Sequence, residues 1–216
     1  IITHYGYRRY DNVFTANEFE RMVGSTGPTN GRILMRSDQP PQSVAIVHCV
    51  GSRDRNYHEY CSRVCCMNAL KFAHQVRTNL PEADIYNFYI DIRSFGKGYE
   101  EFYKRVADEG VKFIRGKVAQ ITDQAISDEE QGKLVIIADD TTIGRPVRIP
   151  VDMVVLCTAL IPRADATQVA RTFNISHSPD GFFREKHPKL DPVATTTDGI
   201  FIAGCAQSPK DIPDTV

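Results

Sequence analysis

The sequence lacks an excess of either charge and any long apolar run. Its 26 Lys and Arg residues balance 27 Asp and Glu residues, so bulk charge will not draw the protein to nucleic acid or to an anionic membrane. No stretch approaches the roughly 18 apolar residues that a membrane-spanning helix needs. The start, Ile1-Ile2-Thr3-His4-Tyr5, has neither an initiator Met nor a signal-peptide pattern, and we expect a piece of a longer polypeptide.

Cysteine is too scarce and too unevenly spaced for a disulfide-stapled secreted fold. The 216 residues include six cysteines, and four of these fall between positions 49 and 66. Reduced thiols that serve a metal or redox chemistry fit this distribution better, so we expect a cytoplasmic protein. The hydrophobic content of 42% is enough for one large or two small domains, and there is no internal repeat.

Apolar β-branched runs alternate with helical patterns along the chain. The expected elements are a helix at 16–23, a buried strand at 43–50, a helix at 60–77, a strand at 83–92, a helix at 99–109, an antiparallel meander within 111–149, and buried strands at 151–159 and 199–206. Strand–helix–strand–helix order implies a parallel sheet. The pattern therefore predicts an α/β fold of the dinucleotide-binding, Rossmann-like type with an antiparallel insert.

The glycine fingerprint of such a fold is missing. A dinucleotide-binding domain normally has Gly-x-Gly-x-x-Gly after its first strand, so that the backbone can approach a pyrophosphate. Here the segment is Cys49-Val50-Gly51-Ser52-Arg53, with one glycine. The sequence thus predicts the fold without its usual ligand.

Four cysteines occupy the place of the lost phosphate loop. Cys61 and Cys65 are four residues apart and are expected on one face of the helix at 60–77, with Cys66 beside them. Cys49 ends the preceding strand, and a strand end and the next helix start meet at one edge of a parallel sheet. The four thiolates are therefore expected to converge on a metal.

Two kinds of metal suit four thiolates, namely zinc and a 4Fe-4S cluster. Adjacent ligands strain a small tetrahedral ion, so the pair Cys65-Cys66 favours the cluster. A zinc-binding or metal-free docking scaffold is the alternative. A redox-active Cys65-Cys66 disulfide ranks last because vicinal cysteines form a strained ring. Cys157 and Cys205 lie far away in sequence and are left out of the ligand set; we expect them to pack or to touch a cofactor.

Several motifs resemble the HdrA family, the FAD- and iron-sulfur-containing electron-transfer component of heterodisulfide reductase. They are Cys49-Val50-Gly51-Ser52-Arg53-Asp54, Tyr60-Cys61-Ser62-Arg63-Val64-Cys65-Cys66-Met67, Asp91-Ile92-Arg93, Gly96-Lys97-Gly98-Tyr99-Glu100, and the closing Gly199-Ile200-Phe201-Ile202-Ala203-Gly204-Cys205-Ala206 with Pro209-Lys210-Asp211-Ile212-Pro213. The resemblance spans nearly the whole chain. It implies a thioredoxin-reductase-like core in which a dinucleotide-type domain is inserted into an FAD domain.

The resemblance also implies cofactors, partners and boundaries. Residues 1–40 would be a tail and linker from the FAD domain, residues 41–155 the Rossmann-like insert, and residues 156–216 the C-terminal piece of the FAD domain. Cys49, Cys61, Cys65 and Cys66 would ligate one 4Fe-4S cluster. The chain would be an electron-transfer module of an oxidoreductase that works with partner subunits, by flavin-based electron transfer or bifurcation. It would be inactive as a fragment.

The resemblance implies FAD contacts at three places. Lys210, Asp211 and Ile212 would begin a helix whose backbone N–H groups can face the isoalloxazine edge, although a surface turn capped by Asp211 is an equal reading of these residues. Gly204 and Cys205 would lie at the ribityl chain, with Cys205 in place of the usual acid. Thr158 ends the strand that returns to the FAD domain. No residue is expected to act as an acid, base or nucleophile.

Overall fold

The computed structural model describes residues 3–216, which divide into two compact units. The first unit takes the chain up to Gly51 and then residues 65–158, and the second takes residues 52–64 and 159–216. The chain therefore leaves the first unit after Gly51, returns at Cys65 and leaves again after Thr158. Ile1 and Ile2, in the predicted tail, lie outside the described residues. The domain boundaries at 40 and 155 stay predictions.

A five-stranded parallel sheet forms the centre of the first unit. Its strand order is β1-β8-β2-β3-β4, with every neighbouring pair parallel. The strands are β1 (Val13–Thr15), β2 (Ser43–Val50), β3 (Asp84–Tyr89), β4 (Lys112–Arg115) and β8 (Met153–Thr158). The predicted parallel α/β fold is thus confirmed, and β2 has the expected bounds.

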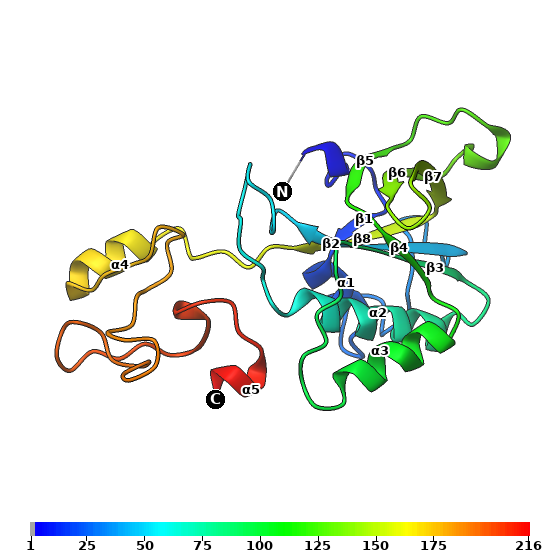
Figure 1. Ribbon diagram of the computed structural model, residues 1–216. Helices are drawn as coiled ribbons and strands as arrows, with labels where there is room; N and C mark the ends of the chain where they lie inside the picture. Colours follow the sequence, from blue (N-terminus) through cyan, green and yellow to red (C-terminus); the bar gives the residue numbers. More distant parts are fainter. Residues whose placement is uncertain (1–2) are drawn as a thin grey trace. The chain divides into compact units, whose positions relative to one another are not determined.

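Helices cover one face of this sheet, and a second sheet covers the other (Figure 1). The helices are α1 (Ala16–Val23), α2 (Cys65–Asn79) and α3 (Tyr99–Asp108). The second sheet is antiparallel and consists of β5 (Val118–Thr122), β6 (Leu134–Asp140) and β7 (Arg145–Val151). This confirms an antiparallel meander from Val118 onward and the bounds of α1, but the first strand of the predicted meander is wrong, because β4 belongs to the parallel sheet.

Strand β2 shows why both faces are covered. All eight of its residues are buried. Val44 and Ile46 belong to the apolar cluster on the helix side, whereas Ala45 and Val47 belong to the cluster under the antiparallel sheet. Successive side chains of a strand point to opposite faces, so a continuous apolar run suits a strand that is buried on both sides.

Helix α2 begins at Cys65, five residues later than the pattern predicted. Arg63 has a left-handed φ of 63°, and the buried hydroxyl of Ser62 accepts a hydrogen bond from the Leu160 N–H at 2.9 Å. A left-handed residue cannot continue a right-handed helix. The prediction that Cys61 and Cys65 share a helix face is therefore wrong, because Cys61 precedes the helix.

The second unit has little regular structure. Its elements are α4 (Ala166–Phe173), the 3-10 turn η3 (Gly204–Ala206) and α5 (Ile212–Thr215). The strand predicted at 199–206 is wrong: within the described residues this segment makes one isolated bridge, between Phe201 and Ala194. Phe201 is 70% exposed. A strand needs a neighbour along its length, which a single bridge does not supply.

The helices of both units are short. The 15-residue α2 is the longest helix in residues 3–216. No helix in that part of the chain combines the length and the hydropathy that crossing a bilayer requires.

An ion pair between Glu130 and Arg148 ties the 3-10 turn η2 (Asp128–Glu130) to β7. Arg148 donates from Nε to Oε1 at 2.9 Å and from Nη2 to Oε2 at 2.8 Å, and the Ile126 N–H donates to Oε2 at 2.8 Å. The guanidinium of Arg148, with help from the Ile126 N–H, lowers the pKa of the Glu130 carboxyl to about 2.

This pair gives the first unit an acid-dependent stability. The unfolded chain takes up the Glu130 proton near its ordinary pKa of 4.5, before the folded chain does, so the free energy of unfolding is expected to fall from about pH 4.5 down to about pH 2. Urea denaturation at several pH values should show a weaker pH dependence for Glu130→Gln. The matched control is the exposed neighbour variant Glu129→Gln. Equal pH dependence in the two variants would contradict the assignment.

Candidate functional site

Cys49 occupies a distorted position at the carboxyl end of β2. The pairing of β2 with β8 shifts register between Val47 and Val50, which places Cys49 in an irregularity of the strand. Its φ is 55°, a left-handed conformation that non-glycine residues rarely adopt, and its side chain is buried. Such strain persists where the surrounding structure holds the residue in place, and it is common at functional sites.

Two more cysteines begin α2 at the same edge of the sheet. Cys65 and Cys66 are the first residues of the helix, and both are buried. The Cys66 thiol lies 3.6 Å from the carbonyl oxygen of Asp91, just beyond the end of β3. The Asp91 carboxylate pairs with Arg115 at 3.1 Å. The ends of neighbouring parallel strands and the start of the crossover helix therefore meet here, as the topology predicts.

Cys157 joins this group, although sequence reasoning left it out. Burial raises the pKa of the Cys157 thiol well above its ordinary value, and the nearby thiols of Cys65, Cys66 and Cys49 raise it further. Four sulfur atoms of the first unit thus lie close enough to interact. The signal that could have found Cys157 was its place at the end of β8, the strand beside β2.

The chemistry of this group suits a metal that prefers sulfur. Within residues 3–216 no three or more His, Cys, Asp or Glu side chains already have the geometry of a metal site. The thiols are nevertheless gathered and buried, and soft sulfur donors favour zinc and iron-sulfur clusters. The donor set fits either group.

His48 on β2 and Asn87 on β3 form a buried polar pair. His48 Nε2 and Asn87 Oδ1 are 2.7 Å apart, and both side chains are buried. Burial lowers the pKa of His48 to about 4, with the Asn87 hydrogen bond opposing the shift, so its imidazole is neutral at pH 7. His48 Nδ1 and Asn87 Nδ2 have no hydrogen-bond partner among the described residues.

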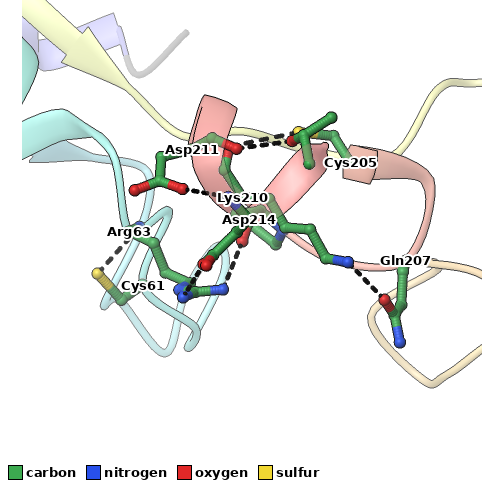
Figure 2. A network of polar contacts seen from close by, with 9 residues as sticks. Cys61, Arg63, Cys205, Gln207, Lys210, Asp211 and Asp214 are labelled. Atoms are coloured by element: carbon green, nitrogen blue, oxygen red, sulfur yellow. Dashed lines mark hydrogen bonds and ion pairs between the residues drawn. The ribbon is translucent and has the colours of Figure 1, made fainter. Parts of the chain in front are cut away.

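Cys61 lies in the second unit, in a loop that is fastened to the C-terminal segment (Figure 2). The Arg63 N–H donates to the Cys61 sulfur at 3.3 Å. The Arg63 guanidinium binds the Pro209 carbonyl at 3.3 Å and the Asp214 carboxylate at 2.5 Å. Arg63 therefore couples the position of Cys61 to the segment that carries the predicted FAD contacts.

Five of the six predicted FAD contacts lie in the second unit. Figure 2 shows three of them, Cys205, Lys210 and Asp211. The Cys205 thiol donates to the Lys210 carbonyl at 3.6 Å, and the Lys210 ammonium donates to Gln207 at 2.7 Å. Asp211 caps the four-residue α5 by accepting from the Asp214 N–H at 2.9 Å, and Ile212 is 80% exposed. This is the capped turn that the sequence allowed.

Gly204 and Thr158 complete the predicted set. Gly204 has a φ of 59°, and a Cβ there would lie 2.9 Å from Thr215 Cγ2, so the turn before α5 requires glycine. Thr158 lies in the first unit, where it pairs with Val50 at the end of β8. A cavity of about 390 Å³ in the second unit reaches Cys205 and is lined mainly by apolar side chains, among them Pro162, Phe182 and Phe183.

Solved structures share this fold at low sequence identity. Thioredoxin reductase from T. acidophilum matches 81% of the chain and 48% of its own length, with a TM-score of 0.50 and 15% identity. L-Lysine 6-monooxygenase from Pseudomonas syringae matches 98% of the chain and 56% of its own length, with a TM-score of 0.55 and 10% identity. They confirm the thioredoxin-reductase-like fold. No protein-family model matches the chain.

Curated relatives are much more similar in sequence. The iron-sulfur HdrA component of the CoB–CoM heterodisulfide reductase of Methanocaldococcus jannaschii is 51% identical over 98% of the chain, and the HdrA component of the H2/formate:CoB-CoM heterodisulfide,ferredoxin reductase of Methanococcus maripaludis is 50% identical over 98%. An HdrA-like protein of Archaeoglobus profundus is 43% identical over 95%. The chain spans 32% of the length of each. Over nearly its whole length, the chain is thus a homologue of one third of the HdrA component of heterodisulfide reductase, as its motifs predicted.

Proposed function

We propose that this chain is an electron-transfer module of a heterodisulfide-reductase-type oxidoreductase. The observation that carries the proposal is the gathering of Cys49, Cys65 and Cys66 where a dinucleotide fold normally binds a phosphate. Buried thiols replace the glycines that a pyrophosphate would need. Sequence identity of 43% to 51% to HdrA proteins gives the redox assignment further support.

The proposed metal ligands are Cys49, Cys61, Cys65 and Cys66, and the proposed group is a 4Fe-4S cluster. When bound, the cluster accepts and donates single electrons. Cys61 lies four positions before Cys65, so the backbone limits the distance between their Cα atoms to roughly 14 Å. The protein buries Cys49, Cys65 and Cys66, and the Arg63 N–H donates a hydrogen bond to the Cys61 sulfur. Burial and hydrogen bonds to sulfur would tune the reduction potential of the cluster.

The proposed FAD contacts are Thr158, Gly204, Cys205, Lys210, Asp211 and Ile212, in the longer protein. The residues present here fit only the edge of a flavin site. The Asp211 carboxylate already accepts a hydrogen bond from the Asp214 N–H. The Cys205 thiol donates to the Lys210 carbonyl, whereas the usual acid would accept a hydrogen bond from a ribityl hydroxyl. We therefore propose that FAD binds tightly only when the remaining part of the FAD domain is present.

The proposal extends to partners and location. The relatives named above are components of larger reductases, so the other subunits of such a complex are the proposed partners, and flavin-based electron transfer or bifurcation is the proposed activity of the whole assembly. Cluster ligation requires reduced thiols, which favours the cytoplasm.

The test is metal and sulfide analysis of protein prepared without oxygen, together with visible absorbance and electron paramagnetic resonance of the reduced sample. We expect iron and sulfide in the ratio of a 4Fe-4S cluster, a broad visible band that bleaches on reduction, and little bound flavin. A colourless protein with stoichiometric zinc would replace the proposal by a zinc-binding scaffold. Tight stoichiometric flavin in this chain would contradict the fragment assignment.

A further inference from the structure

The polar pair His48–Asn87 lies on the helix-covered face of the parallel sheet. Ile46 on β2 and Ile85 on β3 belong to the apolar cluster on that face. Side chains of a strand alternate between faces, so His48, two residues after Ile46, and Asn87, two residues after Ile85, point the same way. Their hydrogen bond of 2.7 Å confirms that the two side chains meet.

Sulfur atoms share this face at the same end of the sheet. Val47 is paired with Leu156, so His48 and Cys157 are the next residues along two neighbouring strands. Cys157 and Cys65 belong to the apolar cluster on the helix side. The pair therefore lies on the same face of the sheet as the Cys65 and Cys157 side chains.

In either arrangement of the His48–Asn87 hydrogen bond, one N–H group of the pair is left without an acceptor. If His48 Nε2–H donates to Asn87 Oδ1, the Asn87 amide N–H2 stays unpaired; if the amide is turned round and donates to Nε2, the proton sits on His48 Nδ1 and that N–H stays unpaired. His48 Nδ1 and Asn87 Nδ2 are buried and find no partner among the described residues. A buried donor without an acceptor costs about 1–3 kcal/mol, so an acceptor is expected.

We propose that the His48–Asn87 pair donates an N–H hydrogen bond to the sulfur centre held by Cys49, Cys65 and Cys66, and thereby raises its reduction potential. This inference rests on the proposed function. Reduction adds electron density to the sulfur atoms and strengthens an N–H···S hydrogen bond, so the bond stabilises the reduced form. His48 and Asn87 act as positioning residues, not as ligands.

The experiment compares midpoint potentials by redox titration, followed by electron paramagnetic resonance, in protein prepared without oxygen. The double variant His48→Phe/Asn87→Leu replaces both partners by apolar groups of similar size, which is the replacement that best preserves folding. We expect its midpoint potential to be more negative than that of the unsubstituted protein. His48→Gln keeps an amide donor at this position and should remain closer to the unsubstituted value.

Tyr86→Phe is the matched control. Tyr86 neighbours Asn87 on β3 but packs on the opposite face, so its hydroxyl is not expected to influence the potential. An unchanged potential in the double variant would overturn the inference and would indicate that a buried water satisfies the pair. Loss of iron from a folded double variant would overturn it too, because the pair would then serve assembly. If the unsubstituted protein binds no iron, the proposed function itself fails.

Discussion

Cys61→Ala is expected to abolish the visible absorbance and the bound iron of protein prepared without oxygen. A 4Fe-4S cluster needs a thiolate for each iron, and loss of one ligand leaves one iron open to water and oxygen. A redox-active Cys65-Cys66 pair would hardly respond to this change. Iron analysis and an absorbance spectrum of the variant measure the effect directly.

Cys205→Ala is the control, because Cys205 is exposed and lies outside the proposed ligand set. It should retain full iron. Full iron in Cys61→Ala would contradict the ligand set. Cys157 would then be the candidate for the fourth ligand, because its thiol lies near those of Cys49, Cys65 and Cys66. Iron analysis of Cys157→Ala would then decide which cysteine is the fourth ligand.

Phe72→Ala is expected to lower the free energy of unfolding of the first unit by about 3–5 kcal/mol. Phe72 is fully buried on α2 and packs edge-on against Phe19 of α1, with ring centroids 5.0 Å apart. Its removal leaves a cavity between two helices and the sheet, and it loosens the helix that carries Cys65 and Cys66. Urea denaturation followed by circular dichroism measures the change.

Ile126→Ala tests whether that loss is specific to the core. Ile126 belongs to the same unit, but its side chain is 75% exposed, so its truncation should change stability by no more than about 0.5 kcal/mol. If Phe72→Ala lowered the free energy of unfolding as little as Ile126→Ala does, the helix layer of the first unit would be loosely packed.

The parallel sheet was predictable because its strands carry their own signal. Residues 44–47 of β2 are apolar without interruption, and three of the four are β-branched. A continuous apolar run of this kind is typical of a strand that is buried on both faces. The helix at 99–109 and the strands of the meander also followed from local periodicity. In these segments the tertiary contacts agree with the secondary structure that the local sequence favours.

The start of α2 was not predictable from periodicity. The apolar spacing continues back through Tyr60, but the left-handed Arg63 keeps α2 from starting before Cys65. The neighbouring Ser62 hydroxyl accepts a hydrogen bond from the Leu160 N–H, 98 residues away in sequence. The strand expected at 199–206 failed for a related reason, since a strand forms only where another strand lies beside it. Both errors concern the second unit, whose structure depends on distant segments.

The sequence predicted that cysteines form the candidate site, but it did not predict which cysteines lie together. Spacing identified Cys49, Cys65 and Cys66, which the fold brings to one edge of the sheet, and Cys61, which belongs to the second unit. Cys157 lies 91 residues beyond Cys66 and enters only through the pairing of β8 with β2. Knowledge of the strand order would have been needed to include it.

The left-handed backbone of Cys49 makes it possible to remove the thiol without disturbing the chain path. At an ordinary buried position, removal of a cysteine thiol also disturbs packing and folding. At a φ of 55°, glycine or asparagine adopts the backbone more easily than cysteine does, so such a substitution deletes the sulfur while the chain path is retained. Cys49 therefore combines a strained backbone with a buried thiol, and Cys49→Gly is the substitution in which loss of the thiol can be measured apart from loss of folding.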